Sequence, residues 1–135
     1  MTAHGSRIRV DRGDHGHAGA VLADLTRLAR VPAGRALLRR LATMADTITI
    51  SKPPPLDPPN AWIVAETLAG PRAMRVYYDP RDWPSPAHPG GPDSDGLLFL
   101  QLSYVEQWLR DGRAPPRGDA TLSWEPYSHE RDSES

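Results

Sequence analysis

The chain has 135 residues and a formal net charge of -1, a size that suits a single domain with one modest core. It contains no cysteine, which excludes disulfide frameworks, thiolate zinc sites and thiol nucleophiles. The near-zero charge predicts no nucleic-acid partner, and the lack of a long apolar run predicts no membrane span and a cytoplasmic location.

The first part of the chain predicts a flexible segment followed by two helices. Residues 1–17 hold few apolar side chains, so we expect a mobile N-terminal segment with room for a short edge strand at 7–10. Apolar side chains then recur at the spacing of an amphipathic helix, at Ala18, Val21, Leu22, Leu25, Leu28 and Ala29. Pro32 suits the first turn of a second helix, whose expected buried stripe is Ala36, Leu37, Leu41 and Met44.

The middle of the chain changes from helical spacing to alternation, which favours strands. Residues 47–50 alternate between threonine and isoleucine. Two further strands are expected at 60–68 and 73–78, joined by a turn through Gly70 and Pro71.

Two loops rich in proline interrupt these strands. Residues 52–59 hold five prolines and can only form a loop. The second loop, at 80–92, contains Trp83 and His88. Long loops in a small domain are often functional, so this loop is a candidate part of a site.

The clearest predicted element is a helix at 97–110. Asp93, Ser94 and Asp95 offer oxygens and negative charge at a helix start. Gly112 suits the position just after the helix end.

The remaining residues are polar and predict a largely disordered tail. Only a short strand at 121–124 interrupts it. The chain is thus expected to consist of a flexible segment at 1–17, one α+β domain at 18–112 and the tail at 113–135.

Five segments of the chain follow a recognisable order. They are VPAGRALLRRLA (31–42), TITI (47–50), the strand that contains Asn60, VYYDP (76–80) and DGLLFLQLSYV (95–105). In this order the chain resembles the NleD-like effector family of HExxH zinc metallopeptidases over roughly residues 8–112. The resemblance implies a zincin-like α+β fold with two N-terminal helices, a small sheet of about three to four strands and a C-terminal helix in the place of the former active-site helix.

The helix that should carry the zinc motif lacks it. In the family, two histidines at i and i+4 of this helix bind zinc, and a glutamate activates the bound water. The matching positions here are Leu100, Gln101 and Tyr104, which supply neither imidazole nor a carboxylate base. We therefore expect no metal, no cofactor and no zinc-protease activity.

A second place for a metal would be the histidine-rich N-terminal segment. Asp14, His15 and His17 lie close together in the sequence, and His4 belongs to the same N-terminal segment. In a flexible segment, such side chains are more often solvated than ligating, and we favour that interpretation.

If the fold is kept, one face of the last helix lines a cleft that has lost its metal. Gln101 and Tyr104 are expected to point into this cleft, and Trp108 to flank it. An amide, a phenol and an indole would suit a small, flat, aromatic ligand. The alternative is that Tyr104 and Trp108 simply pack in the core.

Three further side chains could add charge to the cleft. Arg75 could clamp a carboxylate through two hydrogen bonds. Glu66, which lies within an apolar run, could act as a general base, and His88 could move protons. For each of the three, the alternative is an ordinary solvent-exposed side chain.

Two functions of different classes remain open. The first is a metal-independent biosynthetic enzyme for small molecules that performs an acid–base condensation or cyclisation, such as a Pictet–Spengler reaction of a tryptophan-type amine with an aldehyde. Its expected substrate-binding residues are Arg75 and Trp108, and its expected catalytic residues are Glu66, His88, Gln101 and Tyr104. The second is a non-catalytic pseudo-peptidase that acts as a binding or regulatory module. The oligomeric state is left open and includes a homodimer.

Overall fold

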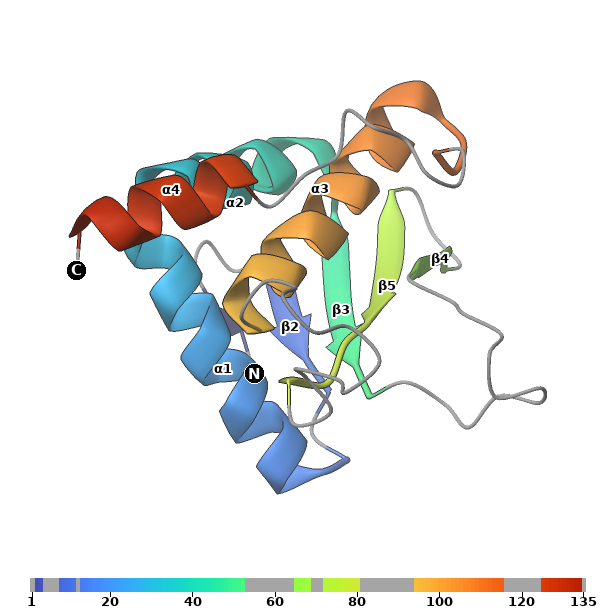
Figure 1. Cartoon of the computed structure of the whole chain (residues 1–135). Coiled ribbons are helices and arrows are strands. Elements are labelled where there is room, and N and C mark those ends of the chain that lie inside the picture. Colours follow the sequence, from blue (N-terminus) through green and yellow to red (C-terminus); the bar gives the residue numbers. More distant parts are fainter. Residues whose placement is uncertain are drawn as a thin grey trace, which may run out of the picture.

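The computed structural model contains four helices and five strands within the residues that it describes (Figure 1). The described residues are 2–3, 8–11, 13–52, 65–68, 72–80, 94–115 and 125–134. The strands are β1 (Thr2–Ala3), β2 (Ile8–Val10), β3 (Thr47–Ser51), β4 (Ala65–Thr67) and β5 (Ala73–Tyr77). The helices are α1 (His15–Arg30), α2 (Pro32–Met44), α3 (Ser94–Asp111) and α4 (Glu125–Glu134). This mixture of helices and one sheet confirms the predicted α+β class.

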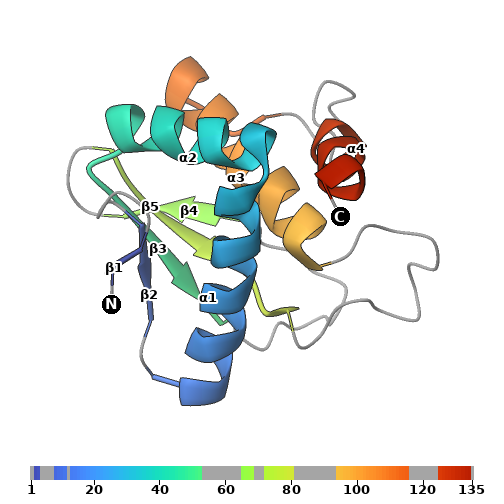
Figure 2. The same ribbon diagram turned by 90° about the vertical axis from the view of Figure 1, so that its left-hand side faces the viewer.

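The five strands form one sheet in the order β1-β2-β3-β5-β4. The inner strands β2, β3 and β5 run parallel, whereas β1 and β4 pair antiparallel at the two edges. Parallel neighbours need a crossover connection, and α1 and α2 supply it between β2 and β3. The helices gather on one side of the sheet, which Figure 2 shows from the side. The other face of the sheet carries no helix among the described residues.

The sheet face toward the helices is apolar because alternate residues of a strand share a face. Two rows of side chains stand there in register across β2, β3 and β5. The rows are Ile8, Ile48 and Met74, followed by Val10, Ile50 and Val76, and each of these residues is at most 2% exposed. Burying one such side chain contributes about 1.5–3 kcal/mol relative to leaving it in water. This layer therefore determines which face of the sheet lies inside.

Local signals explain where the first two helices begin. Asp14 caps α1, and its Oδ1 accepts a hydrogen bond from the backbone N–H of His17 at 3.0 Å. Pro32 occupies the first turn of α2, as predicted. The two helices approach so closely that a Cβ atom on Gly34 would lie 2.2 Å from the carbonyl oxygen of Leu28. A glycine is therefore required at this crossing.

The prediction of a flexible segment over residues 1–17 is wrong for part of that range. β2 lies within the sheet rather than at its edge, and Ile8 and Val10 are each 2% exposed. α1 already begins at His15, because Asp14 supplies its cap. β2 matches the short strand expected at 7–10, although it is an inner strand and not an edge strand. With β1 the sheet has five strands, compared with the expected three to four.

The prediction of a disordered tail is wrong over residues 125–134, which form α4. Tyr127 is fully buried, and its ring stacks on that of Phe99 with the centroids 5.1 Å apart. The sequence of α4 does not predict a helix, because a single buried aromatic side chain gives no periodic pattern. The strand expected at 121–124 lies outside the described residues.

The other predicted elements agree with the structure where it describes them. β3 and β5 match the strands expected at 47–50 and 73–78, and β4 matches the end of the strand expected at 60–68. Most of the two proline-rich loops lies outside the described residues. α3 ends at Asp111, just before Gly112, whose φ of 74° suits glycine. No helix in the described part of the chain is long and apolar enough to cross a membrane.

Candidate functional site

The predicted site residues of β4 and β5 lie on the face of the sheet that carries no described helix. Met74 and Val76 on β5 belong to the core, so Arg75 and Tyr77 point to the opposite face. Glu66 on β4 stands directly opposite Arg75 in the antiparallel pair and shares its face. The structure thus brings together two residues that the sequence singled out, Glu66 and Arg75.

The structure does not bring these residues together with those of α3. Gln101 and Tyr104 belong to a helix that packs on the core side of the sheet, against α1, α2 and β5. The expectation that Glu66 and Arg75 add charge to the cleft beside α3 is therefore wrong, because the alternation along β5 turns Arg75 away from it. His88 lies outside the described residues.

Glu66, Arg75 and Tyr77 form a polar group that we call the sheet-face cluster. The Tyr77 hydroxyl donates a hydrogen bond to Glu66 Oε1 at 2.6 Å. This hydrogen bond is the main reason why the pKa of Tyr77 is raised above its ordinary value, and burial and the negative charge of Glu66 add to the increase. Arg75 acts in the opposite direction on the same pKa. Tyr77 therefore holds its proton at neutral pH, directly beside a carboxylate.

One hydrogen-bond donor of Arg75, its Nε, is not used by its neighbours. Arg75 faces Glu66 across the strand pair, and its charge and its hydrogen bond to Tyr77 lower the pKa of that phenol. Its Nε is buried and has no hydrogen-bond partner. A guanidinium carries five N–H donors in a fixed fork that matches a carboxylate, and a buried donor without a partner is costly. This combination favours an anionic ligand at Arg75.

The sheet-face cluster belongs to a row of polar side chains that crosses the sheet. Arg9, Thr49, Arg75 and Glu66 stand in register on β2, β3, β5 and β4. Tyr77 was not among the predicted site residues, although it lies two positions after Arg75 on β5 and therefore shares its face.

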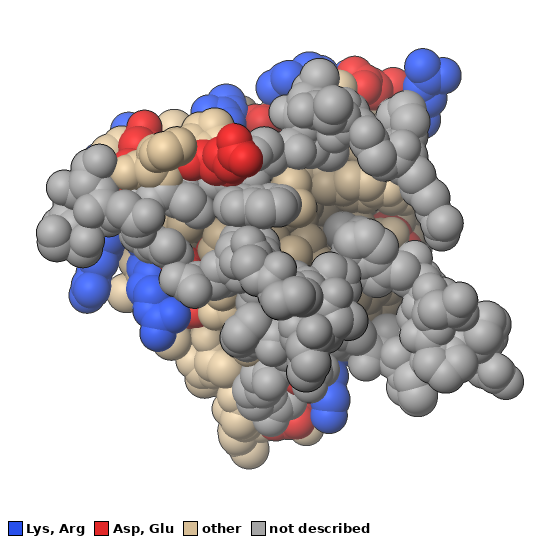
Figure 3. All heavy atoms as spheres, viewed as in Figure 1, with Lys and Arg blue, Asp and Glu red and all other residues tan. Residues whose placement is uncertain are grey.

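Gln101 and the aromatic side chains of α3 form the second group. Gln101 is 6% exposed, and its Oε1 is buried without a hydrogen-bond partner. Tyr104 and Trp108 are half-buried against the core, and their rings meet edge to face with the centroids 6.1 Å apart. The aromatic side chains therefore take part in packing, whereas the amide keeps an unused acceptor. Figure 3 shows a hollow on the side of the molecule where the end of α3 faces β4 and β5.

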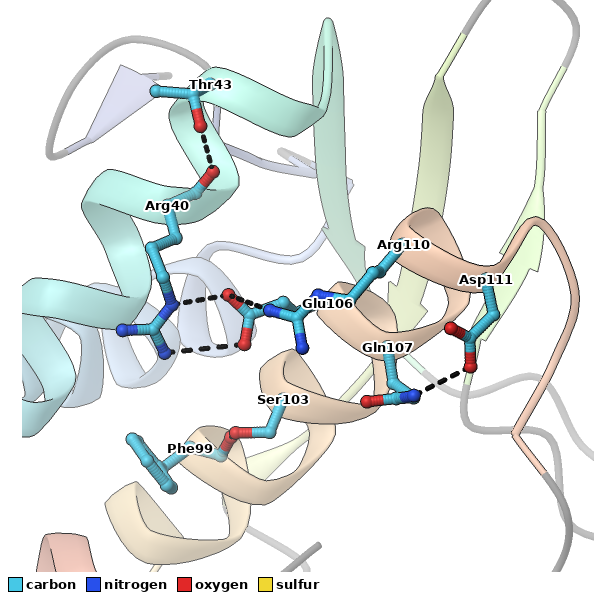
Figure 4. Close-up of polar contacts among 8 residues, drawn as sticks. All are labelled: Arg40, Thr43, Phe99, Ser103, Glu106, Gln107, Arg110 and Asp111. Atoms are coloured by element: carbon cyan, nitrogen blue, oxygen red, sulfur yellow. Dashed lines mark hydrogen bonds and ion pairs between the residues drawn. The ribbon is translucent and has the colours of Figure 1, made fainter. Parts of the chain in front are cut away.

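A buried carboxylate on the other side of α3 positions this helix against α2. Glu106 is 8% exposed and accepts hydrogen bonds from Arg40 Nε at 2.5 Å and Arg40 Nη2 at 3.3 Å. Arg110 Nη2 lies 3.7 Å from the same carboxylate, and Figure 4 shows the two guanidinium groups on either side of it. Both carboxylate oxygens are engaged, so we assign this cluster to the fold rather than to a ligand.

A buried polar network joins α1, the end of β5 and the start of α3. His17 Nε2 donates a hydrogen bond to the carbonyl oxygen of Tyr78 at 2.7 Å. The Tyr78 hydroxyl lies 2.5 Å from Asp24 Oδ2 and 2.6 Å from the carbonyl oxygen of Ser94. Burial, and then the hydrogen bond to Asp24, raises the pKa of Tyr78. These groups satisfy one another, so His17 has a structural role here rather than a place in a solvated tail.

The described ranges contain no group of three or more histidine, aspartate or glutamate side chains that could hold a metal ion. Leu100, Gln101 and Tyr104, the three residues that the sequence comparison with the zinc motif singled out, all lie on α3. In the N-terminal patch, His15 is exposed and His17 is buried, so these two side chains do not share one environment.

Comparisons with known proteins give no information on the function of this chain. No protein-family model matches the sequence, and no curated protein and no solved structure matches it.

Proposed function

We propose that this chain is a metal-independent enzyme that performs acid–base chemistry on a small, carboxylate-bearing molecule. The observation that carries this proposal is the sheet-face cluster. It combines a protonated phenol, a carboxylate 2.6 Å away and a guanidinium with an unused buried donor. Such a set provides an acid, a base and an anion clamp without any cofactor.

The roles of the three side chains follow from their chemistry. Arg75 would hold the carboxylate of the substrate through its N–H fork. Tyr77 would donate its proton to the reacting group, since its raised pKa keeps the phenol protonated at neutral pH. Glu66 would accept a proton from the substrate and re-protonate Tyr77 through their hydrogen bond.

The proposed reaction class is a condensation or cyclisation, with the Pictet–Spengler reaction as the example. A tryptophan-type amine and an aldehyde would form an imine with loss of water. Protonation of the imine nitrogen by Tyr77 would then allow the indole carbon to attack, and Glu66 would remove the ring proton to restore the aromatic system. An amino-acid substrate supplies the carboxylate that Arg75 requires.

The scaffold that we propose for this activity is zincin-like, and we place it in the cytoplasm. Two helices, a strand, an antiparallel edge pair and then a long helix follow one another in the order that underlies the family resemblance. In this proposal α3 would correspond to the helix that carries the zinc motif in the family, and its Leu100, Gln101 and Tyr104 would leave a scaffold that works without the metal.

The test is a turnover assay on protein that has been treated with a chelator. Tryptophan and an aldehyde would be supplied, and cyclised product would be measured by mass spectrometry. Glu66→Gln is expected to lower the rate by about 10²–10⁴-fold, the usual range for loss of a general base. Arg75→Lys is expected to raise KM, because it keeps the charge and removes the fork.

Thr67→Ala is the matched control, because Thr67 neighbours Glu66 on β4, is exposed and points to the other face. A rate that depends on added zinc, or one that Glu66→Gln leaves unchanged, would refute the proposal.

The second candidate is a non-catalytic pseudo-peptidase that binds a ligand on α3. The observation that favours it is the buried, unpartnered Oε1 of Gln101 beside the packed rings of Tyr104 and Trp108. In that case, ligand binding without turnover would be lost in Gln101→Leu and retained in Glu66→Gln. The opposite pattern assigns the ligand to the sheet-face cluster.

A further inference from the structure

A second arginine stands in the same row of the sheet as the sheet-face cluster. Arg9 of β2 lies beside Thr49 of β3, and Thr49 lies beside Arg75 of β5. We call these three residues the arginine row. The Arg9 side chain is exposed, and no hydrogen bond or ion pair engages it within the part of the chain that the structure describes. The N–H donors of its guanidinium are therefore available to a ligand.

The carboxylate that follows Arg9 on the same side of β2 is engaged by other groups. Asp11 lies two positions after Arg9, so the two side chains share a face of the sheet. Asp11 Oδ1 accepts a hydrogen bond from the backbone N–H of Gly13 at 3.1 Å, and its Oδ2 accepts one from the Ser51 hydroxyl at 3.4 Å. Asp11 thus leaves the positive charge of Arg9 without a counterion.

The spacing of the arginine row allows both guanidinium groups to contact one small molecule. Only β3 separates β2 from β5, so the Cα atoms of Arg9 and Arg75 lie two strand spacings, or roughly 9.6 Å, apart. Thr49 between them has a short, half-buried side chain, which leaves room above it for a ligand. Two positive charges in one row repel each other, and an anionic ligand between them relieves this repulsion.

We propose that the molecule bound at the sheet-face cluster is a dicarboxylate, with one carboxylate at Arg75 and the other at Arg9. This inference rests on the proposed function, in which Arg75 holds the first carboxylate. Each guanidinium matches one carboxylate through its fork of N–H groups. The Thr49 hydroxyl between them can donate a hydrogen bond to the ligand.

The distance between the two forks is the reason for choosing a dicarboxylate. Two separated guanidinium groups suit two separated oxyanions joined by a few carbon atoms, whereas one phosphate would need both arginines to converge on one point. A monocarboxylate held at Arg75 would leave Arg9 unused. The arginine row therefore acts as a specificity device that selects for the second carboxylate.

The test is an NMR titration of the full chain with glutarate and with pentanoate, read at the arginine Nε–H signals. The two probes have the same number of carbon atoms and differ by one carboxylate. Wild type is expected to bind glutarate about tenfold more tightly, the usual gain from hydrogen bonds to a charged group. Arg9→Thr is expected to reduce this preference to less than about twofold and to leave the affinity for pentanoate unchanged. Arg75→Ala is expected to weaken the binding of both probes.

Arg39→Ala is the matched control, because it removes the same charge from the other side of the sheet. Arg39 is exposed on α2, which lies with the other helices away from the arginine row (Figure 1). This variant should keep the preference for glutarate at its wild-type value. A loss of preference as large as that in Arg9→Thr would show that the total charge determines it, and the proposal would then fail.

A second variant covers the case in which Arg9→Thr does not fold, as judged by circular dichroism. Arg9→Lys keeps the charge and removes the fork, so it should reduce the preference to about threefold. Equal affinity of wild type for glutarate and pentanoate would refute the dicarboxylate. Inorganic phosphate that binds more tightly than glutarate, and loses affinity in Arg9→Thr, would assign the arginine row to a phosphate instead.

The binding measurement and the turnover assay separate this inference from the proposed function. A preference for glutarate that depends on Arg9, in a chain without turnover, would contradict the proposed enzyme and leave the dicarboxylate site standing. Turnover that depends on Glu66, in a chain without this preference, would contradict the dicarboxylate alone.

Discussion

The two faces of the sheet are made from the same strands and obey different constraints. On β3, Ile50 is fully buried, whereas its neighbour Thr49 is half-buried on the other face. On β5, Val76 belongs to the core, while Arg75 beside it keeps an unused donor. The helix-covered face is determined by burial, so it accepts little except apolar side chains. The opposite face is free of that constraint, and there the strand register can gather polar groups into a cluster.

The largest expected effect is a difference between neighbouring positions of β3. Ile50→Ala is expected to lower the free energy of unfolding by about 2–5 kcal/mol, because it empties a fully buried site. Thr49→Ala is expected to change it by less than about 0.5 kcal/mol. Urea denaturation of both variants measures the contrast. A cost at Thr49 similar to that at Ile50 would mean that both faces are packed to the same degree.

The next expected effect is a loss of stability at alkaline pH. Tyr77 lies on the open face of the sheet and Tyr78 on the buried face, so the two tyrosines allow the faces to be compared. The pKa of each phenol is raised in the folded state, Tyr78 chiefly by burial and Tyr77 chiefly by Glu66. A raised folded pKa means that the stabilisation is complete below the unfolded value near 10 and is lost as the pH rises above it. The free energy of unfolding should therefore fall by up to about 1.4 kcal/mol per pH unit for each proton retained.

Urea midpoints measured between pH 8 and pH 11 check this expectation. Tyr78→Phe should flatten the fall more than Tyr77→Phe, because Tyr78 is 1% exposed and Tyr77 is half-buried. Equal slopes for the two variants would contradict the assignment of Tyr78 to the buried face.

The smallest effect concerns the sheet-face cluster alone. Glu66→Gln should lower the pKa of Tyr77, because it removes the carboxylate that stabilises the protonated phenol. Arg75→Ala should raise the same pKa, since Arg75 favours the phenolate. Carbon NMR titration of the tyrosine rings reads both shifts. Shifts of the same sign in the two variants would show that the three side chains do not interact as the geometry indicates.

Much of the fold could be predicted from the sequence because burial leaves a periodic pattern. Such patterns occur in α1, α2, β3, β5 and α3. Pro32 marks the start of α2, and Gly112 follows the end of α3. The inner position of β2 and the existence of α4 could not be predicted in the same way. A single buried tyrosine gives α4 no period, and the place of β2 depends on its pairing with the distant β3.

The sequence predicts which residues are candidates for a site, but it does not predict which of them lie together. Glu66 and Arg75 stand out in the sequence as charges within strands, and Gln101 stands out against the family motif. Which of them share a side depends on the register of β4 with β5 and on the packing of α3. Neither is encoded in local sequence, because both follow from pairing between segments that lie apart.

The parallel pairing of β2 with β3 also determines how the domain must assemble. Ile8 meets Ile48 and Val10 meets Ile50, so the strand near the start of the chain finds its place only after two intervening helices have turned the chain back. Contacts between segments so far apart form late and slow the folding reaction. Until they form, the edge of β3 has open backbone groups that another chain can pair with. In the finished sheet β2 covers this edge of β3, so deleting residues 8–10 is expected to lower the yield of refolding through aggregation.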